Sequence, residues 1–156
     1  MKYKVIWLKG YMCIFDEGTD TSSLAAYENA KGYVTVRYTK EVYGKAGVFS
    51  RVLLNAPQGL MVDHINGNTL DNRRKNLRLA TNAQNQANSN ARNTNYPKGV
   101  RRKRGRPSFE AKIKVNGVDM YLGSFNTILA AESAYKQAAN KYQNEFAFHN
   151  SRGEQP

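Results

Sequence analysis

The stretch that decides the fold is Leu60-Met61-Val62-Asp63-His64-Ile65-Asn66-Gly67-Asn68, which TLDNRRKNLRLATNAQN continues over residues 69–85. Its apolar start predicts a short strand that runs into Asp63 and His64. Asn66-Gly67-Asn68 then predicts a tight turn, because Asn and Gly tolerate positive φ angles. Asp63 and His64 are therefore expected where a strand gives way to a turn.

The second half of this stretch predicts another strand and a helix. A polar loop leads to Arg78-Leu79-Ala80, which reads as a second short strand. Thr81 and Gln84 fit a capping box, in which the Thr side chain caps the helix start and the Gln side chain reaches back to it. We expect the helix to continue to about residues 87–90. The order is thus strand, loop, strand and helix.

Asp63 and His64 carry the side chains that phosphodiester hydrolysis needs. The reaction requires a deprotonated water, and a hard divalent cation can stabilise the added negative charge and the leaving oxygen. Such a cation takes carboxylate and amide oxygens as ligands. A neutral histidine can accept the proton of the water near pH 7. Because strand neighbours point to opposite faces, the two residues can share a site only if the strand ends or is distorted there.

Four blocks of this region carry a family resemblance. Val62-Asp63-His64-Ile65-Asn66-Gly67, Leu70-Asp71-Asn72-Arg73, Asn76-Leu77-Arg78 and Thr81…Asn85 resemble the HNH endonuclease family of the phage and homing type. The resemblance implies a ββα-metal fold that holds one Mg²⁺ ion between two strands and a helix, with Mn²⁺ as an alternative ion.

The resemblance also implies a role for each matching residue. Asp63 would be a metal ligand, and His64 would be the general base that activates water. Asn76 would tie the loop together and help to orient the histidine. Asn85 would complete the metal site with its amide oxygen, and Asn82 is a competing candidate for that role.

A simpler interpretation exists for each of these residues taken alone. An isolated Asp-His pair is usually a surface or turn feature. Asn66, Asn68 and Asn72 are typical of turn geometry. His149, the second histidine, is expected to be structural or exposed to solvent. The catalytic hypothesis depends on the complete ordered set.

The remainder of the N-terminal segment predicts strands. Residues 33–38 are rich in β-branched and aromatic side chains after the turn signal of Gly32. Residues 48–54 predict a strand or a short helix, and residues 16–23 a polar loop. No catalytic pattern is found in residues 1–55.

The C-terminal region has the periodicity of a hairpin followed by a helix. Phe109-Glu110-Ala111-Lys112-Ile113-Lys114-Val115 alternates, so that Lys112 and Lys114 are expected to point outward. Asn116-Gly117 predicts a hairpin turn, and residues 118–122 the return strand, ended by Gly123. Thr127 is expected to cap a helix. Its predicted apolar face comprises Ala131, Ala134, Tyr135, Ala138 and Tyr142.

This region also carries a resemblance. Tyr96-Pro97-Lys98-Gly99-Val100-Arg101, Tyr121-Leu122-Gly123-Ser124-Phe125 and the alanine-rich segment after Thr127 resemble the AP2 DNA-binding domain. The resemblance implies a three-stranded antiparallel sheet that packs on one helix and lies in the DNA major groove. The expected DNA-binding residues are Arg101, Arg102, Lys103, Arg104, Arg106, Lys112 and Lys114. The expected core residues are Phe109, Ile113, Tyr121, Phe125 and Tyr135.

The composition agrees with a polyanionic partner. The chain has 24 Lys and Arg against 12 Asp and Glu, a formal net charge of +12, which attracts nucleic acid. The basic run at residues 98–106 could also be only a solvated loop. The single cysteine, Cys13, cannot form an internal disulfide and cannot supply a thiolate zinc site alone. With no signal-like or membrane-spanning segment, we expect a cytoplasmic protein, in the host cell if a phage encodes it.

Together these features predict an α+β protein with five parts. These are an N-terminal β-rich segment (1–55), an HNH ββα-metal core (56–90), a linker (91–97), an AP2-like domain (98–150) and a tail (151–156). The predicted function is metal-dependent cleavage of one strand of double-stranded DNA by a monomer or weak dimer, with no membrane partner. The alternatives are a catalytically inactive DNA-binding regulator of the same fold and an RNA-binding accessory protein, which the ordered Asp, His and Asn residues disfavour.

Overall fold

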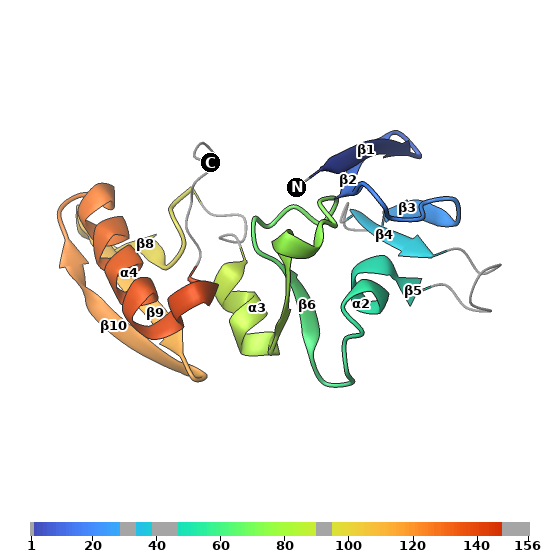
Figure 1. Cartoon of the computed structure of the whole chain (residues 1–156). Helices are drawn as coiled ribbons and strands as arrows, with labels where there is room; N and C mark the ends of the chain where they lie inside the picture. The colour runs from blue at the N-terminus through green and yellow to red at the C-terminus, as the bar shows by residue number, and fades with distance from the viewer. Residues whose placement is uncertain (1, 29–33, 39–46, 90–94, 148–156) are drawn as a thin grey trace. The chain divides into compact units, whose positions relative to one another are not determined.

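The chain forms two compact units, Met1–Asn82 and Ala83–Pro156. The computed structural model describes residues 2–28, 34–38, 47–89 and 95–147 (Figure 1). The elements of the first unit are β1 (Tyr3–Leu8), β2 (Tyr11–Asp16), β3 (Leu24–Glu28), β4 (Val34–Tyr38), β5 (Gly47–Val48), α2 (Phe49–Leu53), β6 (Met61–His64), the 3-10 turn η1 (Arg74–Asn76) and β7 (Leu77–Ala80). Then follow α3 (Asn82–Asn88), β8 (Val100–Arg102), β9 (Phe109–Val115), β10 (Val118–Phe125), α4 (Ile128–Gln143) and the 3-10 turn η2 (Asn144–Phe146). Several small antiparallel sheets and separate helices confirm the predicted α+β class.

The first unit has a small apolar core formed by its N-terminal strands. Cys13, Phe15, Leu24, Val36 and Phe49 are buried together, and the rings of Phe15 and Phe49 pack edge to face with centroids 5.6 Å apart. Residues 48–54, predicted as a strand or short helix, form the end of β5 and the helix α2. The predicted strand at 33–38 is β4, whereas Gly32 and Tyr33 lie outside the described residues.

The β6–β7 hairpin encloses the polar loop. The two strands pair antiparallel with Asp63 opposite Arg78 and His64 opposite Leu77. The loop also pairs with β2, because Ile14 N donates to Leu70 O at 2.9 Å and Asn72 N donates to Ile14 O at 2.8 Å. The N-terminal strands thus help to fix the backbone of the polar loop.

The helix α3 begins directly after Thr81, where the sequence predicts a helix start, and ends at Asn88. Its C-terminal carbonyls have a side-chain partner in Lys98, whose Nζ donates to Gln86 O at 2.8 Å and to Ala87 O and Ser89 O. A basic side chain at this position satisfies carbonyls that the helix itself leaves unpaired. Part of the predicted linker lies outside the described residues, as do His149 and the tail.

The strands β8, β9 and β10 form an antiparallel sheet in the order β10-β9-β8. The predicted Asn116-Gly117 hairpin is confirmed, with φ angles of 51° and 84°. The return strand does not end at Gly123, however. It runs to Phe125, and the register shifts between Tyr121 and Gly123. The strand continues because a bulge at Leu122 absorbs the extra residue and Gly123 accepts a φ of 134°.

The helix α4 is capped as predicted, since Thr127 Oγ1 accepts a hydrogen bond from Ala130 N at 3.1 Å. Ala131, Tyr135 and Ala138 are buried as predicted. Tyr142 is not, because it lies in the last turn, and Ala147 takes the core position beside Ala138 and Ala139.

The predicted core of this unit needs one further correction. Ile113 and Tyr135 are buried, and Phe109 and Phe125 pack against the cluster of Val100, Ala111 and Ala131. Tyr121 is instead 53% exposed. Its neighbours Met120 and Leu122 face the core, so the alternation of a strand directs Tyr121 to the other face. No helix in the described ranges is long and apolar enough to cross a membrane.

Candidate active site

Asp63 and His64 lie at the end of β6, where the chain turns. Asp63 is buried, and its Oδ2 accepts a hydrogen bond from Arg78 Nε on the paired strand at 2.8 Å and forms an ion pair with Arg78 Nη2, also at 2.8 Å. The strand ends at His64, whose carbonyl accepts from Gly67 N at 2.8 Å. Neighbouring side chains of a regular strand point to opposite faces, so Asp63 and His64 can serve one site only where the strand ends, as it does here.

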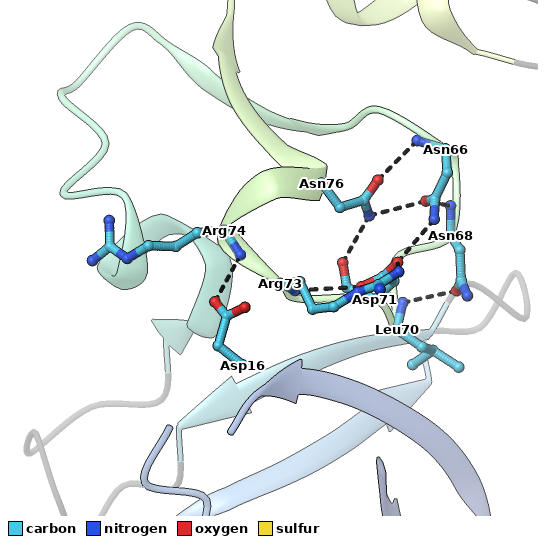
Figure 2. Close-up of polar contacts among 8 residues, drawn as sticks. All are labelled: Asp16, Asn66, Asn68, Leu70, Asp71, Arg73, Arg74 and Asn76. Carbon is cyan, nitrogen blue, oxygen red and sulfur yellow. Dashed lines mark hydrogen bonds and ion pairs between the residues drawn. The ribbon is translucent and has the colours of Figure 1, made fainter. Parts of the chain in front are cut away.

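An asparagine network holds the loop that follows His64 (Figure 2). The buried amide of Asn76 accepts from Asn66 N at 3.0 Å and donates to Asn66 Oδ1 at 2.9 Å and to Asp71 O at 2.8 Å. Asn66 Nδ2 in turn donates to Asp71 Oδ2 at 2.9 Å. Buried amides that are fully paired in this way define the path of an irregular backbone.

Asp71 lies at the centre of this network and has an arginine partner. Arg73 donates through Nε to Oδ1 at 2.8 Å and through Nη2 to Oδ2 at 2.6 Å. Burial raises the pKa of Asp71, but the hydrogen bonds and the charge of Arg73 outweigh it, so that the pKa lies below its ordinary value. The charged form of Asp71 is therefore the one that holds the loop.

The loop is also attached to the β1–β2 hairpin by side chains. The guanidinium of Arg73 lies 5.4 Å from the ring centre of Tyr3, and Arg74 N donates to Asp16 Oδ2 at 3.0 Å (Figure 2). The sequence offers no local signal for these contacts, because the partners are far apart in the chain.

The ring of His64 faces the side-chain amide of Asn72, a residue that the sequence predicts only as part of a turn. Its Nε2 lies 3.5 Å from Asn72 Oδ1. Asn72 is 2% exposed, and its Nδ2 donates to Thr69 O at 3.3 Å, which orients the amide oxygen toward the ring. Nothing in the spacing separates Asn72 from the turn residues Asn66 and Asn68, so sequence reasoning could not identify it.

The pKa of His64 is lowered. Burial favours the neutral ring, while the contact with Asn72 and the negative charges of Asp63 and Asp71 oppose this effect without cancelling it. The ring is therefore neutral at pH 7, the form that can accept a proton.

Asp63, His64 and Asn76 belong to the first unit, and Ile65 N, directly after His64, donates to the carbonyl of Asn76 at 2.8 Å. Asn85 lies in α3 and belongs to the second unit, whereas Asn82 is the last residue of the first. Within the described ranges, no three His, Cys, Asp or Glu side chains gather as metal ligands. The predicted donors, the Asp63 carboxylate and the Asn85 amide oxygen, include only one residue of these four types.

The predicted DNA-binding residues lie on and beside the sheet of the second unit. In β9, Lys112 and Lys114 alternate with Ala111 and Ile113, which are buried. Arg101 pairs with Glu110 across β8 and β9 and lies on the same face as the lysines. Arg102 is exposed, but the alternation of β8 puts it on the face of Val100. The loop between β8 and β9 carries Lys103, Arg104 and Arg106.

Comparisons with known proteins find a similarity that includes the β6–β7 hairpin and most of α3. Residues 55–87 match the model of the HNH endonuclease family. An uncharacterized HNH endonuclease of Acanthamoeba polyphaga mimivirus is 35% identical over 91 residues, which are 58% of this chain and 47% of that protein. The chain thus spans about half the length of this curated relative. No solved structure matches the chain. Residues 55–87, which include Asp63, His64, Asn76 and Asn85, are thus the part of the chain that is similar to the HNH endonuclease family.

Proposed function

We propose that the protein is a metal-dependent endonuclease that nicks one strand of duplex DNA, with His64 as the general base. The observation that carries this proposal is the HNH match over residues 55–87, in which His64 is half-buried at a strand end beside a fixed polar loop. A neutral imidazole at this place can take the proton from an attacking water. Asn72 and the Asn76 network act as positioning residues, because they hold the ring and the loop in one arrangement.

Asp63 and Asn85 are the proposed metal ligands. Arg78 orients the Asp63 carboxylate by holding its Oδ2. A carboxylate and an amide oxygen are hard donors, which fit Mg²⁺ or Mn²⁺. Such an ion, when bound, would stabilise the charge that develops on the phosphate and on the leaving oxygen.

The sheet of the second unit is the proposed docking surface for duplex DNA, in an AP2-like manner. Arg101, Lys112 and Lys114 share its exposed face, on the side opposite to the residues that pack on α4. Two- and three-stranded ribbons can enter the major groove, and basic side chains there contact phosphates or guanine edges. A single metal site acts on one phosphate at a time, so a monomer is expected to nick rather than to cut both strands.

The test is to incubate the protein with supercoiled plasmid in the presence of Mg²⁺, Mn²⁺ or a chelator. We expect conversion to the relaxed nicked circle with the metal ions and none with the chelator. Plasmid that stays supercoiled with every divalent ion, while the protein still binds it, would support the rival function of an inactive DNA-binding regulator. Retained binding to RNA without binding to duplex DNA would instead favour an RNA-binding protein.

A further inference from the structure

An acidic residue lies in the middle of the basic sheet face. Glu110 belongs to the central strand β9, opposite Arg101 in β8 and opposite Ser124 in β10. It shares this face with Lys112 and Lys114, since alternate residues of a strand point to the same side. A carboxylate here repels DNA phosphates, so its position in a proposed docking face requires an explanation.

The contacts of Glu110 explain why an acidic side chain is found on this face. Its Oε2 accepts from Arg101 Nε at 2.9 Å and lies 2.7 Å from Arg101 Nη2. Its Oε1 lies 3.7 Å from Lys103 Nζ. The Arg101 hydrogen bond is the largest cause of the lowered pKa of Glu110, so the carboxylate is charged at neutral pH.

The two partners differ in exposure. The Glu110 side chain is 13% exposed, whereas the Arg101 side chain is 62% exposed. Glu110 therefore holds one edge of the guanidinium close to the sheet. Within the described part of the chain, Arg101 Nη1 has no hydrogen-bond partner, and most of the Arg101 side chain is exposed to solvent.

An arginine held in this way is suited to read a base. Arginine recognises guanine through two parallel hydrogen bonds to O6 and N7 in the major groove. A flexible arginine loses side-chain freedom when it forms them, and a group that fixes the guanidinium beforehand reduces this loss. A lysine or an unrestrained arginine would contact any phosphate nearby and would contribute no sequence preference.

We infer that Glu110 is a specificity-determining residue, which orients Arg101 so that its outer edge reads a guanine in the major groove. The inference rests on the proposed docking of the sheet to duplex DNA. The negative charge of Glu110 weakens the attraction of the sheet to DNA phosphates and so lowers the affinity for any duplex. The oriented guanidinium of Arg101 in turn increases the preference for duplexes that carry guanine at the contacted position.

The same face offers a matched control. Asp119 in β10 lies opposite Lys114, and their charged groups are 3.5 Å apart. Both side chains are exposed, at 65% and 60%, and this pair fixes no arginine fork. Replacing Asp119 by Asn removes one negative charge from the face, as Glu110→Gln does, but leaves Arg101 unchanged.

The experiment begins with selection of duplexes from a random-sequence library by the wild-type protein, without metal. Affinities for a selected duplex and for a scrambled duplex of equal composition are then measured for the wild type, Glu110→Gln, Arg101→Lys and Asp119→Asn. For Glu110→Gln we expect the ratio of the two affinities to fall on the order of tenfold, with equal or tighter binding to the scrambled duplex. Asp119→Asn should leave the ratio unchanged.

A second comparison separates orientation of Arg101 from an effect on folding. Arg101→Lys keeps the positive charge but removes the planar guanidinium. It should therefore lower the ratio of the affinities for the selected and the scrambled duplex about as much as Glu110→Gln does. The double variant should lower it no further, because both changes remove the same interaction. The inference would be overturned if the two substitutions lowered the affinity ratio additively, if Glu110→Gln left the ratio unchanged, or if Asp119→Asn lowered it equally. It would also be overturned if the wild-type protein selected no guanine-dependent site. The nicking assay decides the proposed nuclease separately, because a nuclease without sequence preference would still nick plasmid.

Discussion

The polar loop of the first unit and the sheet of the second unit are held together by different forces. In the loop, Asp71, Asn72 and Asn76 are buried and paired with one another or with the backbone. In the second unit, Ile113, Tyr135 and three alanines of α4 form an apolar core, and the charged side chains lie on the opposite face. The loop thus uses polar groups to fix an irregular backbone, whereas the sheet uses apolar packing and leaves charged side chains on its other face.

The largest expected effect comes from adding a side chain where the core of the second unit has no room for one. Gly99 has a φ of 74°, and an added Cβ would lie 2.1 Å from the Tyr135 ring and 2.5 Å from Lys112 O. We expect Gly99→Ala to destabilise the second unit by roughly 3 kcal/mol or more, through backbone strain and steric overlap. Peptide-resolved hydrogen exchange should show faster exchange in β9 and α4, with the β6–β7 hairpin unchanged.

The matched control is Gly105→Ala. Gly105 has nearly the same φ, 73°, but nothing lies within 4 Å of an added Cβ. Only the backbone strain remains, so we expect Gly105→Ala to lower the free energy of unfolding of the second unit by about 1 kcal/mol. Equal effects of the two substitutions would show that close packing at Gly99 is not what holds this unit together.

The next largest effect is expected in the polar loop. Asn76→Ala leaves Asn66 N and Asp71 O without their partner inside the protein, which costs roughly 2–3 kcal/mol. Exchange should increase in residues 65–76 and remain unchanged in the second unit, the reverse of the pattern for Gly99→Ala.

Asn68→Ala tests whether burial matters in this loop. Asn68 Oδ1 accepts one hydrogen bond, from Leu70 N at 3.0 Å, and the residue is exposed. Water can replace this hydrogen bond, so we expect Asn68→Ala to lower the free energy of unfolding by less than about 1 kcal/mol. A loss as large as that of Asn76→Ala would contradict the special role of the buried network.

A smaller effect concerns the charges that the sheet presents. Replacing Arg101, Lys112 and Lys114 together by Gln should lower the affinity for duplex DNA and reduce the slope of log K against log salt by roughly 0.9 for each phosphate that is no longer neutralised. The measurement is a salt titration of binding to a short duplex. The control replaces Lys136 and Lys141 of α4, and an unchanged slope in the triple variant would reject docking through this face.

The smallest effect is a shift in pH dependence. Burial lowers the pKa of His64, so the neutral base persists to lower pH, and the nicking rate should fall only below about pH 6.5. The contact with Asn72 raises this pKa. Asn72→Ala should therefore move the acid limb of the rate profile to still lower pH, with a reduced plateau, because the ring is no longer oriented. An acid limb above pH 6.5 in the wild type would contradict the buried neutral base.

Local rules were sufficient for the regular parts of the molecule. The Asn116-Gly117 hairpin, the strand β9 and the Thr127 cap follow from turn chemistry, alternation and capping, and the structure has all three. The position of His64 at a strand end follows from the turn signal at Asn66-Gly67. These features depend on residues that are near one another in the chain.

The missed features depend on contacts between distant segments. Asn72 looks like another turn residue until the fold puts its amide beside His64, and Glu110 looks like one charge of an alternating strand until β8 brings Arg101 opposite to it. The exposure of Tyr121 and the bulge at Leu122 follow from how β10 meets β9 and the core. Such pairings are set by tertiary structure, which spacing alone does not encode.

The central claim, that His64 is the base of an HNH nuclease, is tested most directly by the nicking rate of His64→Ala. The rate is measured on supercoiled plasmid with Mg²⁺ and excess protein, beside the wild type and a surface control, Lys136→Gln. General-base catalysis predicts that His64→Ala is slower by about a hundredfold or more while its affinity for DNA is unchanged, and that the control nicks normally. Equal nicking by His64→Ala and the wild type would contradict the account.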